Sequence, residues 1–390
     1  MVAETGVITT EHHHGSHQHL IAAFPWRSVP DAVESVDAIV VPTIHHPRRL
    51  AQAARLASAL GCVLVTLHSH QWSSARVAAR LMPPDVRFVA IDIDDVRRLN
   101  LPDFSTTALL RATRFARTAD LSAKRNTGLI LARLMGWGRI VFLDDDIAVG
   151  SHEDVGRTAA LLNAYDAVGM HIGGFPDNSV VCHAHKRTGG QQDSFVGGGA
   201  LAVETTRNPS FFPNVYNDDW FYLLDETSLR RLAVTGTVRQ REYDPFDRPA
   251  RARDQEFGDV LAEGVYWILD GAGGGPIKET VTDPQHWAGF LRKRRIFIED
   301  VLCRVRRLPA AQRPVARAME ASLLAALGRL ATIEPSLCVD YINAWVEDRR
   351  RWADHLVTIP QLFDTAASVK WLAKGSTPPL RWQCSVRSNA

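Results

Sequence analysis

Short, uninterrupted runs of apolar residues recur through the first part of the chain, separated by longer stretches with helical spacing. Apolar runs without polar interruptions are typical of strands that are buried on both faces. They predict strands at residues 38–41, 63–67, 88–91 and 140–143. Because such strands, when they alternate with helices, form parallel sheets covered on both sides, we expect an α/β fold.

Two helices in this part have recognisable start and stop signals. Residues 47–60 begin at Pro47, which suits a first helical turn, and Gly61 follows at the usual stop position. Residues 124–135 form the second helix, and Gly136 follows it. Both helices lie between predicted strands, as the covering helices of a parallel sheet do.

The second half of the chain has a mixed pattern. Residues 180–182 and 200–203 look like strands, and glycines cluster at 197–199 and 271–275. Residues 290–372 are mostly helical in pattern and rich in Ala, Leu and Arg.

These patterns divide the chain into an irregular tail at residues 1–35, an α/β core at 36–295 and a mostly helical extension at 296–390. The tail contains histidines that could bind a metal: His12, His13, His14, His17 and His19. Because no Cys or carboxylate partner accompanies them, a tail outside the fold is the simpler interpretation, and we exclude it from the core.

The composition is that of an ordinary globular protein. The 390 residues are 46% hydrophobic and 23% charged, which excludes bulk disorder. The 45 basic and 43 acidic side chains give a net charge of +2, too even to indicate nucleic acid or an anionic membrane as the main partner. No apolar run approaches the roughly 18–20 residues that span a bilayer, and no signal peptide is evident. Five scattered cysteines without a CxxC pair favour a reducing compartment, so we expect a cytoplasmic protein without a transmembrane segment.

Three consecutive acids, Asp144, Asp145 and Asp146, follow the strand at 140–143 directly. Carboxylates so close together repel one another unless a cation compensates them. Ligands of open α/β sheets bind at the carboxyl ends of the strands. A Mg²⁺ or Mn²⁺ ion that is held by one or two carboxylates and completed by substrate phosphates satisfies both conditions. A solvated acidic turn is the alternative, although such turns rarely follow an all-apolar strand this abruptly.

The helix before this strand carries Arg125, Asn126 and Gly128 in its first turns. Together with Asp144 and Asp146, this pattern resembles the glycosyltransferases of the GT-A fold, especially the large family 2 of inverting enzymes. Their pattern is an Arg-Asn-x-Gly helix start, an apolar strand and an Asp-x-Asp metal motif, here with about one extra helical turn between the parts. The resemblance implies a Rossmann-like mixed sheet flanked by helices, with the C-terminal helices as an appendage.

The same resemblance implies three binding sites. It places at the nucleotide-diphosphate sugar Pro42, Thr43, Arg125, Asn126, Asp144, Asp145 and Arg292. It places at the acceptor Gly198, Gly199 and Trp220, and at a Mg²⁺ or Mn²⁺ ion Asp144, Asp146 and His286. Family members usually carry an Asp after the second strand that bonds the nucleotide base, whereas this chain has His68 and Ser69 there, so the base is left open.

Asp218 and Asp219 resemble the Glu-Asp motif that supplies the catalytic base of the family. Asp219 matches the family's Asp, and Asp218 stands where the family usually has Glu. Either acid could take a proton, and an acidic helix N-cap is the alternative interpretation.

The resemblance implies hexosyl-type transfer from a nucleotide-diphosphate sugar to an acceptor hydroxyl. Inversion is expected from Asp219 alone, since retaining GT-A enzymes share the metal motif. The alternative is a metal-dependent phosphohydrolase or nucleotidyltransferase that uses the same acids. Phosphatases of the haloacid-dehalogenase type also place Asp-x-Asp after a buried strand, but with Thr or Val where this chain has Ala148. A non-catalytic sugar-nucleotide-binding protein is a third possibility.

Two further groups have simpler interpretations. His183 and His185, as neighbours in a strand, would face the same side and could contact an acceptor or serve structure. Glu256, Asp259 and Glu263 fall at helical spacing and predict a solvated helix face.

Overall fold

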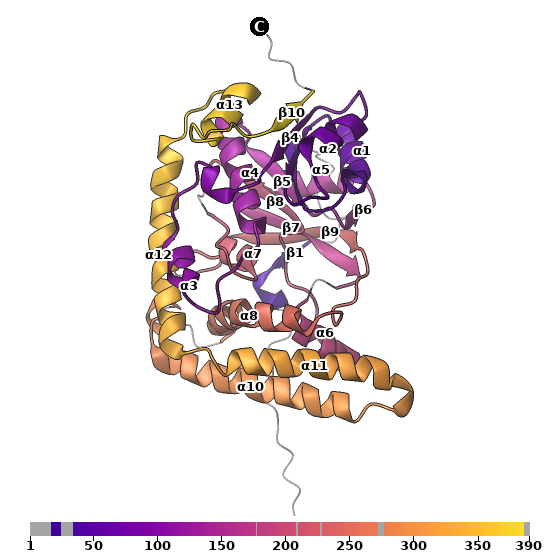
Figure 1. Cartoon of the computed structure of the whole chain (residues 1–390), viewed down its shortest axis with the longest axis vertical. Coiled ribbons are helices and arrows are strands. Elements are labelled where there is room, and N and C mark those ends of the chain that lie inside the picture. The colour runs from indigo at the N-terminus through magenta and orange to yellow at the C-terminus, as the bar shows by residue number, and fades with distance from the viewer. Residues whose placement is uncertain are drawn as a thin grey trace, which may run out of the picture.

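The computed structural model describes residues 17–24, 34–176, 178–207, 210–226, 228–271 and 277–385. Within these ranges the chain forms a ten-stranded mixed sheet with helices against it and a set of long C-terminal helices at its side and base (Figure 1). The expected Rossmann-like mixed sheet flanked by helices is therefore confirmed. His12, His13 and His14 lie outside the described residues.

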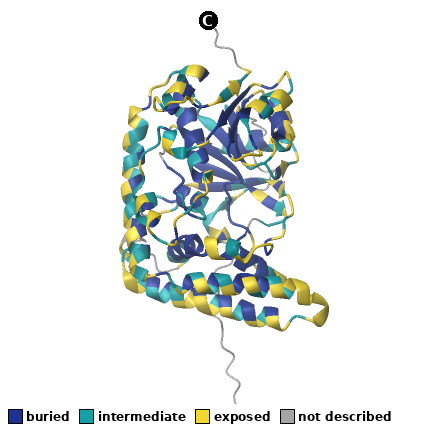
Figure 2. Cartoon of the chain, viewed as in Figure 1, coloured by how far each residue is buried: buried dark blue, intermediate teal, exposed yellow. Residues whose placement is uncertain are grey.

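Four parallel strands form the centre of the sheet in the order β4-β3-β2-β5. Their bounds are β2 (Ala38–Thr43), β3 (Val63–His68), β4 (Phe88–Asp92) and β5 (Arg139–Leu143). Every residue of β2, β3 and β4 is buried, as Figure 2 shows by the dark colour of the strands. The apolar runs predicted these four strands correctly to within a residue or two.

The strand order reverses at β2, because the chain continues from β2 to β3 and β4 on one side and places β5 on the other. At such a switch point the loops after the two strands diverge and leave a crevice. The ladder between β2 and β5 ends at Val40, so Pro42, which has no N–H to donate, lies beyond it. Thr43 ends β2, and the three acids at 144–146 follow β5, so they border this crevice.

The helices near the sheet also agree with the expected signals. The helix predicted at 47–60 is a 3₁₀ turn, η3 (Pro47–Leu50), that continues as α1 (Ala51–Leu60), and Gly61 caps it with φ 64°. Helix α4 (Leu121–Met135) begins one turn earlier than predicted and ends at Gly136. The remaining elements of this half are α2 (Ala75–Leu81), η4 (Val96–Arg98), α3 (Ser105–Arg111), β6 (Ile147–Val149) and α5 (His152–Leu161).

The second half of the sheet is mixed. Strand β8 (Ala200–Glu204) is antiparallel to β5, β7 (Ala167–Gly174) is antiparallel to β8, and β9 (Leu232–Gln240) is parallel to β7. The strand predicted at 180–182 is wrong, because these residues begin the helix α6 (Val180–Arg187). All three side chains are buried in the helix, and a short apolar run is equally compatible with a buried strand, so the apolar pattern alone does not distinguish the two.

Segments near both ends of the chain join the edges of the sheet. Strand β1 (Ala22–Ala23) pairs with β9, and β10 (Trp382–Cys384) pairs with β4. The exclusion of the N-terminal tail from the fold is therefore wrong for residues 17–24, which begin with a 3₁₀ turn, η1 (Gln18–Leu20). Added edge strands satisfy backbone groups that would otherwise be exposed.

The C-terminal helices wrap around the core. Helices α10 (Pro284–Arg306) and α11 (Arg313–Leu330) lie side by side below it, and α12 (Pro335–Thr358) runs along its flank toward α13 (Thr365–Leu372) (Figure 1). The boundary expected at residue 295 falls inside α10, which continues through it. The short elements α7 (Asp218–Tyr222), α9 (Ile277–Val281) and η5 (Ala310–Gln312) and the long helix α8 (Pro249–Asp270) complete the described fold.

None of the helices in the described ranges combines the length and the apolar character that a membrane-spanning helix needs. The bent pair Ala310–Leu330 and Pro335–Thr358 meets the criterion only when its two helices are taken together, by length and composition.

A buried ionic network joins α8 to α10 and overturns the solvated face expected for α8. Glu256, Asp259 and Glu263 are only 0%, 4% and 6% exposed. Arg294 of α10 donates to Glu256 at 2.8 and 3.0 Å and to Asp259 at 2.9 Å. Helical spacing correctly places the three acids on one face of α8. The residue of α10 that covers this face, Arg294, lies 35 to 38 residues further along the chain, beyond the reach of a local pattern.

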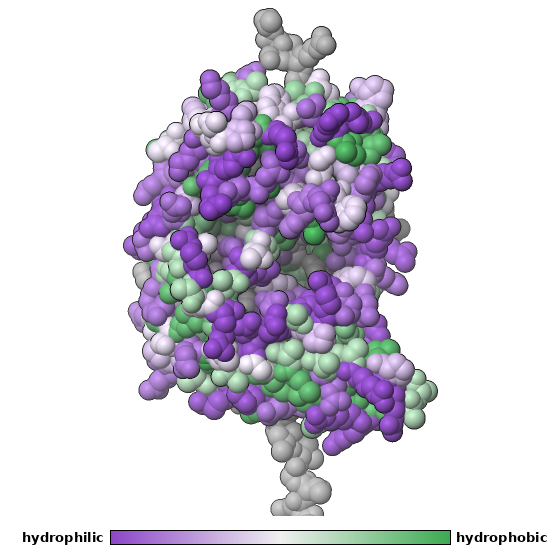
Figure 3. All heavy atoms as spheres, in the orientation of Figure 1, coloured by the Kyte–Doolittle hydropathy of each residue, from purple (hydrophilic) through white to green (hydrophobic). Residues whose placement is uncertain are grey.

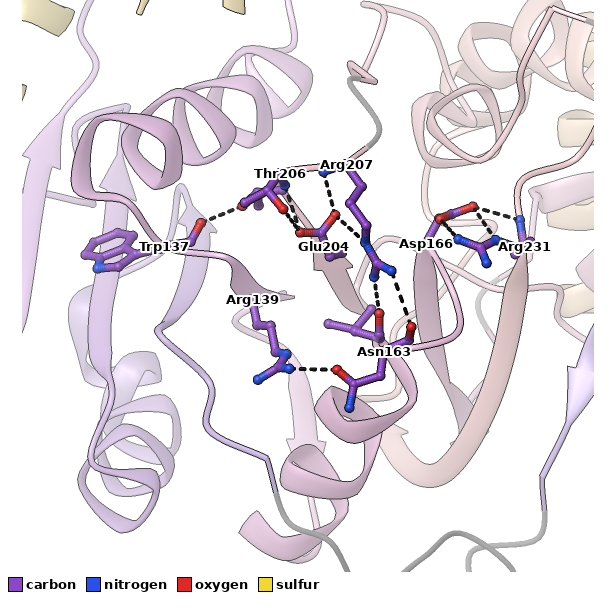
Figure 4. Close-up of polar contacts among 10 residues, drawn as sticks. Trp137, Arg139, Asn163, Asp166, Glu204, Thr206, Arg207 and Arg231 are labelled. Atoms are coloured by element: carbon purple, nitrogen blue, oxygen red, sulfur yellow. Dashed lines mark hydrogen bonds and ion pairs between the residues drawn. The ribbon is translucent and has the colours of Figure 1, made fainter. Parts of the chain in front are cut away.

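The amino end of β5 is closed by polar contacts among side chains and backbone (Figure 4). Arg139 donates to the side chain of Asn163 at 2.8 Å, and Arg207 donates to the Asn163 carbonyl at 3.3 Å. Nearby, Arg231 bonds Asp166 at 2.8 Å. These contacts join strand ends on the side of the sheet opposite to the acid cluster, which leaves the carboxyl ends of β2 and β5 for ligands.

Candidate active site

A cavity of about 180 Å³ lies beside the carboxyl end of β5. Its walls come from α4, α6, α7, α8 and the segment before β8, and its polar lining includes Arg125, Asp144, Asp218, Asp219 and Glu263. The surface view shows that this face of the molecule is hollowed near its centre, above the pair of helices α10 and α11 (Figure 3). The cavity thus brings together acids that lie more than a hundred residues apart in the sequence.

Asp145, the middle acid, fastens the end of β5 to the end of β2. The Thr43 hydroxyl donates to its carboxylate, and Nδ1 of His45 lies 3.0 Å from both of its oxygens. Arg49 forms an ion pair with it at 3.7 Å. Only 6% of the Asp145 side chain is exposed. Asp145 and Thr43 therefore hold the two sides of the crevice in register, and sequence analysis missed His45 and Arg49 as their partners.

Lys124 performs a similar task between β2 and β3. Its side chain is 1% exposed, and Nζ donates to the Thr43 carbonyl at 2.9 Å and to the Ser69 hydroxyl at 2.7 Å. Asp120 lies 3.2 Å from the same nitrogen. Burial lowers the pKa of Lys124, and the charge of Asp120 opposes that effect. The spacing in the sequence indicates this position for Lys124, because it lies one helical turn before Gly128, which packs on β2.

Arg125 lies between two acids of the cavity. Its guanidinium donates to Asp218 at 2.9 Å and to Asp144 at 3.5 Å, and its Cζ lies 5.4 Å from the centre of the Phe212 ring. The guanidinium also occupies the space beside Gly198, where a Cβ atom would lie 2.6 Å from Cζ. Arg125 thus positions Asp144 and Asp218, and Gly198 has no side chain because Arg125 fills the room for one.

We expect Gly198→Ala to displace Arg125 and to lower the free energy of unfolding by about 1–3 kcal/mol, the usual cost of overpacking. Gly150→Ala is the matched control, because nothing lies within 4 Å of a Cβ atom placed there. Thermal or urea unfolding of both variants measures the difference. Equal stability of the two variants would show that the guanidinium moves aside freely.

Asp144 has one carboxylate oxygen that is held and one that is not. Oδ2 takes the hydrogen bond from Arg125, whereas Oδ1 is buried without a hydrogen-bond partner among the described residues. Burial raises the pKa of Asp144 to about 6, although the charge of Arg125 opposes this, and the neighbouring acids add to it. Buried oxygens of this kind call for a partner, and a cation supplies one.

Asp146 is the third acid of the turn and does not line the cavity. Burial raises its pKa, and the charge of Asp145 adds to the effect, while Gln240 bonds its side chain and opposes it. Among the described residues, no group of three or more His, Cys, Asp or Glu side chains is arranged to hold a metal ion. Two carboxylates with elevated pKa values and one free buried oxygen nevertheless fit Mg²⁺ or Mn²⁺, which take their remaining ligands from water and substrate phosphates.

The two acids of the Asp218-Asp219 pair have different environments. Asp218 is 6% exposed and accepts hydrogen bonds from Arg125 and from Ser122 at 2.9 Å. Burial raises its pKa, and Arg125 opposes that effect. Asp219 is half-buried, and its oxygens accept from the backbone N–H groups of Gly198 at 2.6 Å and Trp220 at 2.9 Å. Both acids line the cavity, but Asp218 is held by the charged group of Arg125, whereas Asp219 is the more exposed of the two and, among the described residues, bonds only backbone N–H groups. Asp218 is therefore a positioning residue, and Asp219 is the candidate base.

The expected acceptor residues lie around these acids. The Gly199 carbonyl accepts from the Asp144 N–H at 2.9 Å, and the Gly198 N–H reaches Asp219, so the two glycines link both acids. Trp220 lines the cavity.

Several expected site residues do not line this cavity. Asp146, Gly198 and Gly199 lie within two residues of ones that do, and Pro42, Thr43 and Asp145 belong to the crevice between β2 and β5, whereas Asn126, Arg292 and His286 lie elsewhere. The Asn126 side chain clamps the backbone of Phe212 at 2.8 and 2.9 Å, and Arg292 is exposed on α10. Nε2 of His286 lies 3.0 Å from the Gly264 carbonyl. In addition, His183 and His185 lie on a helix, not a strand, and contact Tyr243 and Arg304 respectively. The set of ligand-binding residues proposed for the chain therefore does not include Asn126, His183, His185, His286 or Arg292.

Among the solved structures that resemble the chain are the following two, both at low sequence identity. A mannosyltransferase from Pyrobaculum calidifontis, solved in complex with GDP-Man and Mn²⁺, is 14% identical, with 90% of this chain and 92% of that chain covered and a TM-score of 0.43. A provisionally named nucleotide-diphospho-sugar transferase from Desulfovibrio desulfuricans G20 is 12% identical, with 68% and 98% covered and a TM-score of 0.27. No protein-family model and no curated protein matches the sequence.

Proposed function

We propose that the chain transfers a sugar from a nucleotide-diphosphate sugar to an acceptor hydroxyl, with Mg²⁺ or Mn²⁺ held by Asp144 and Asp146. The observation that carries this proposal is the buried, unpartnered Oδ1 of Asp144 in a cavity that also contains Asp219. A metal-binding acid and a candidate base then border the same space, at the switch point of the sheet. The Arg-Asn-x-Gly and Asp-x-Asp resemblance supports the same reaction.

The donor binds, in this proposal, in the crevice between the ends of β2 and β5. Thr43, Asp145 and Lys124 hold the walls of that crevice in place through their mutual contacts. His68, where family members carry the base-binding Asp, does not replace it. Its two ring nitrogens contact Ser73 at 2.7 Å and Thr66 at 2.8 Å, and burial lowers its pKa to about 3, so it is a neutral part of the core.

A bound divalent ion would neutralise the charge that develops on the diphosphate leaving group. The residues of the chain supply the other requirements. Arg125 holds Asp144 in place from the side opposite its free oxygen. Asp219 takes the proton of the acceptor hydroxyl as that oxygen attacks the anomeric carbon. Attack from the face opposite the diphosphate inverts the anomeric centre.

We expect Asp146→Ala to abolish metal-dependent binding of the nucleotide sugar and to leave the fold intact, because it removes one of two carboxylates that hold the ion. Titration calorimetry with nucleotide-diphosphate sugars, with and without Mn²⁺, measures the loss. Asp340→Ala removes an exposed acid of α12 and is the control for net charge. Unchanged Mn²⁺-dependent affinity in Asp146→Ala would refute the metal assignment.

A further inference from the structure

One side chain from near the N-terminus is buried at the end of the cavity. His17 is 1% exposed, its Nε2 lies 3.1 Å from a carboxylate oxygen of Glu263, and its Nδ1 bonds Asp270. Both acids come from α8. Glu263 also lines the cavity that contains Asp144 and Asp219. The imidazole of His17 therefore occupies a position next to the candidate active site.

Three aromatic rings surround the same imidazole. Its centre lies 5.4 Å from the ring of Trp220, 5.3 Å from Tyr266 and 6.1 Å from Phe195. The three rings also pack against one another, with centroids 4.7–5.3 Å apart. Aromatic faces attract cations within about 6 Å, and aromatic cages bind organic ammonium groups in this way. The three rings and the two carboxylates therefore form an environment suited to a cation.

The His17 imidazole that fills this environment is itself a cation. Burial alone lowers the pKa of His17, but the hydrogen bonds and charges of Asp270 and Glu263 outweigh it and raise the pKa to about 9. The imidazole is thus protonated at neutral pH. A neutral ring in the same place would leave two carboxylates without compensation.

The rest of the segment is partly exposed, although Leu20, Ile21, Ala22 and Phe24 pack against the core. None of residues 18–24 is buried, and β1 pairs through two residues only. Gln18 donates to the Ser194 carbonyl at 2.8 Å, His19 reaches Asp270 at 2.8 Å, and the Phe24 N–H donates to Val234 at 2.9 Å. Among residues 17–24 only His17 is buried, so it is the anchor of the segment.

We propose that Glu263, Asp270, Trp220, Tyr266 and Phe195 form a binding site for a protonated amine, which His17 fills as an intramolecular occupant. The ligand is the acceptor, which would place its ammonium group here while its hydroxyl faces Asp219. This identification of the ligand rests on the proposed function, whereas the cation site itself does not. Binding of the acceptor then requires residues 17–24 to withdraw, so the segment also keeps the site closed in its absence.

Imidazole tests the cation site directly. In full-length His17→Ala the emptied site should bind imidazolium, so the unfolding temperature should rise with imidazole concentration at mildly acidic pH. Sodium chloride at equal concentration controls for ionic strength. Wild type, whose site is filled, and the double variant His17→Ala/Glu263→Gln should not respond. An equal response of all three proteins, or no response of His17→Ala, would overturn the site.

Two substitutions of His17 provide a test that does not depend on an emptied site. His17→Lys keeps a cation, and His17→Gln keeps a polar side chain without charge. We expect the unfolding temperature of His17→Lys to lie closer to wild type than that of His17→Gln. Equal temperatures, or a more stable His17→Gln variant, would show that the environment does not select for charge.

The acceptor assignment has its own measurement. With His17→Ala, transfer to an amino sugar should be faster than transfer to the same sugar with a hydroxyl in place of the amine. Equal rates, or a preference for the neutral sugar, would overturn the assignment. Absence of transfer to any acceptor would count against the proposed function, while the imidazole titration would still decide on the cation site.

Discussion

Asp219→Asn should lower turnover with the true acceptor by about 10²-fold or more, the usual scale for loss of a general base. The substitution keeps the size of the side chain, but an amide cannot take a proton. An amide also has a single oxygen, so it keeps only one of the two hydrogen bonds that Asp219 accepts from the Gly198 and Trp220 N–H groups. The affinity for the donor should barely change, because the base acts on the acceptor and not on the diphosphate. Steady-state kinetics and donor titration on the same variant separate the two effects.

Two other acids serve as comparisons for Asp219. Asp193 is exposed and lines the same cavity, so Asp193→Asn should leave turnover near wild type. Asp218 is buried and paired with Arg125, so Asp218→Asn should reduce stability more than the proton-transfer step. Near-full turnover in Asp219→Asn would remove its role as base. Loss of donor binding instead would make it a residue of the donor site.

Arg294→Met should lower the free energy of unfolding by about 3–5 kcal/mol, because it leaves buried acids without their partner. The guanidinium contacts both Glu256 and Asp259, which lie on adjacent turns of α8. Burial already raises the pKa of Glu256 to about 7 although Arg294 opposes it. Without Arg294 the acids should be buried as protonated groups, and the cost of protonating them grows as the pH rises above their unfolded values.

Urea unfolding across a pH series measures this effect. The stability gap between wild type and Arg294→Met should narrow as the pH falls through about 7, where Glu256 becomes protonated in folded wild type as well. Proton uptake by the unfolded chain is the same for both proteins and cancels from the difference. Arg295→Met, which removes an exposed neighbour on α10, is the matched control. If Arg294→Met were as stable as Arg295→Met at neutral pH, the network would not hold α8 and α10 together.

Local patterns in the sequence predicted the centre of the fold because its determinants are local. Apolar runs located β2, β3, β4 and β5, and Gly61 and Gly136 marked helix ends where a positive φ is required. The acid turn after β5 was likewise visible as a break from apolar to charged residues. Its partners His45 and Arg49 were not, because neither lies within a recognisable motif.

The features that the sequence did not reveal depend on contacts between distant segments. His17 meets its two acids across 246 and 253 residues, and Arg294 covers an α8 face that reads as solvated when taken alone. Residues 180–182 form a helix although their apolar run is equally suited to a strand. Arg292 was expected at the diphosphate and is exposed, whereas Arg294, two residues further along α10, is buried.

The most direct test of the proposed reaction is to determine which bond of the donor is broken. Wild-type protein is incubated with nucleotide-diphosphate sugars, with Mn²⁺ or with a chelator, and the nucleotide products are separated by anion-exchange chromatography. Sugar transfer, or slow transfer to water, cleaves the bond to the anomeric carbon, so we expect a nucleoside diphosphate to appear only with the metal. Release of a nucleoside monophosphate with a sugar phosphate, or of inorganic phosphate, would instead indicate a nucleotidyltransferase or phosphohydrolase and would contradict the proposed function.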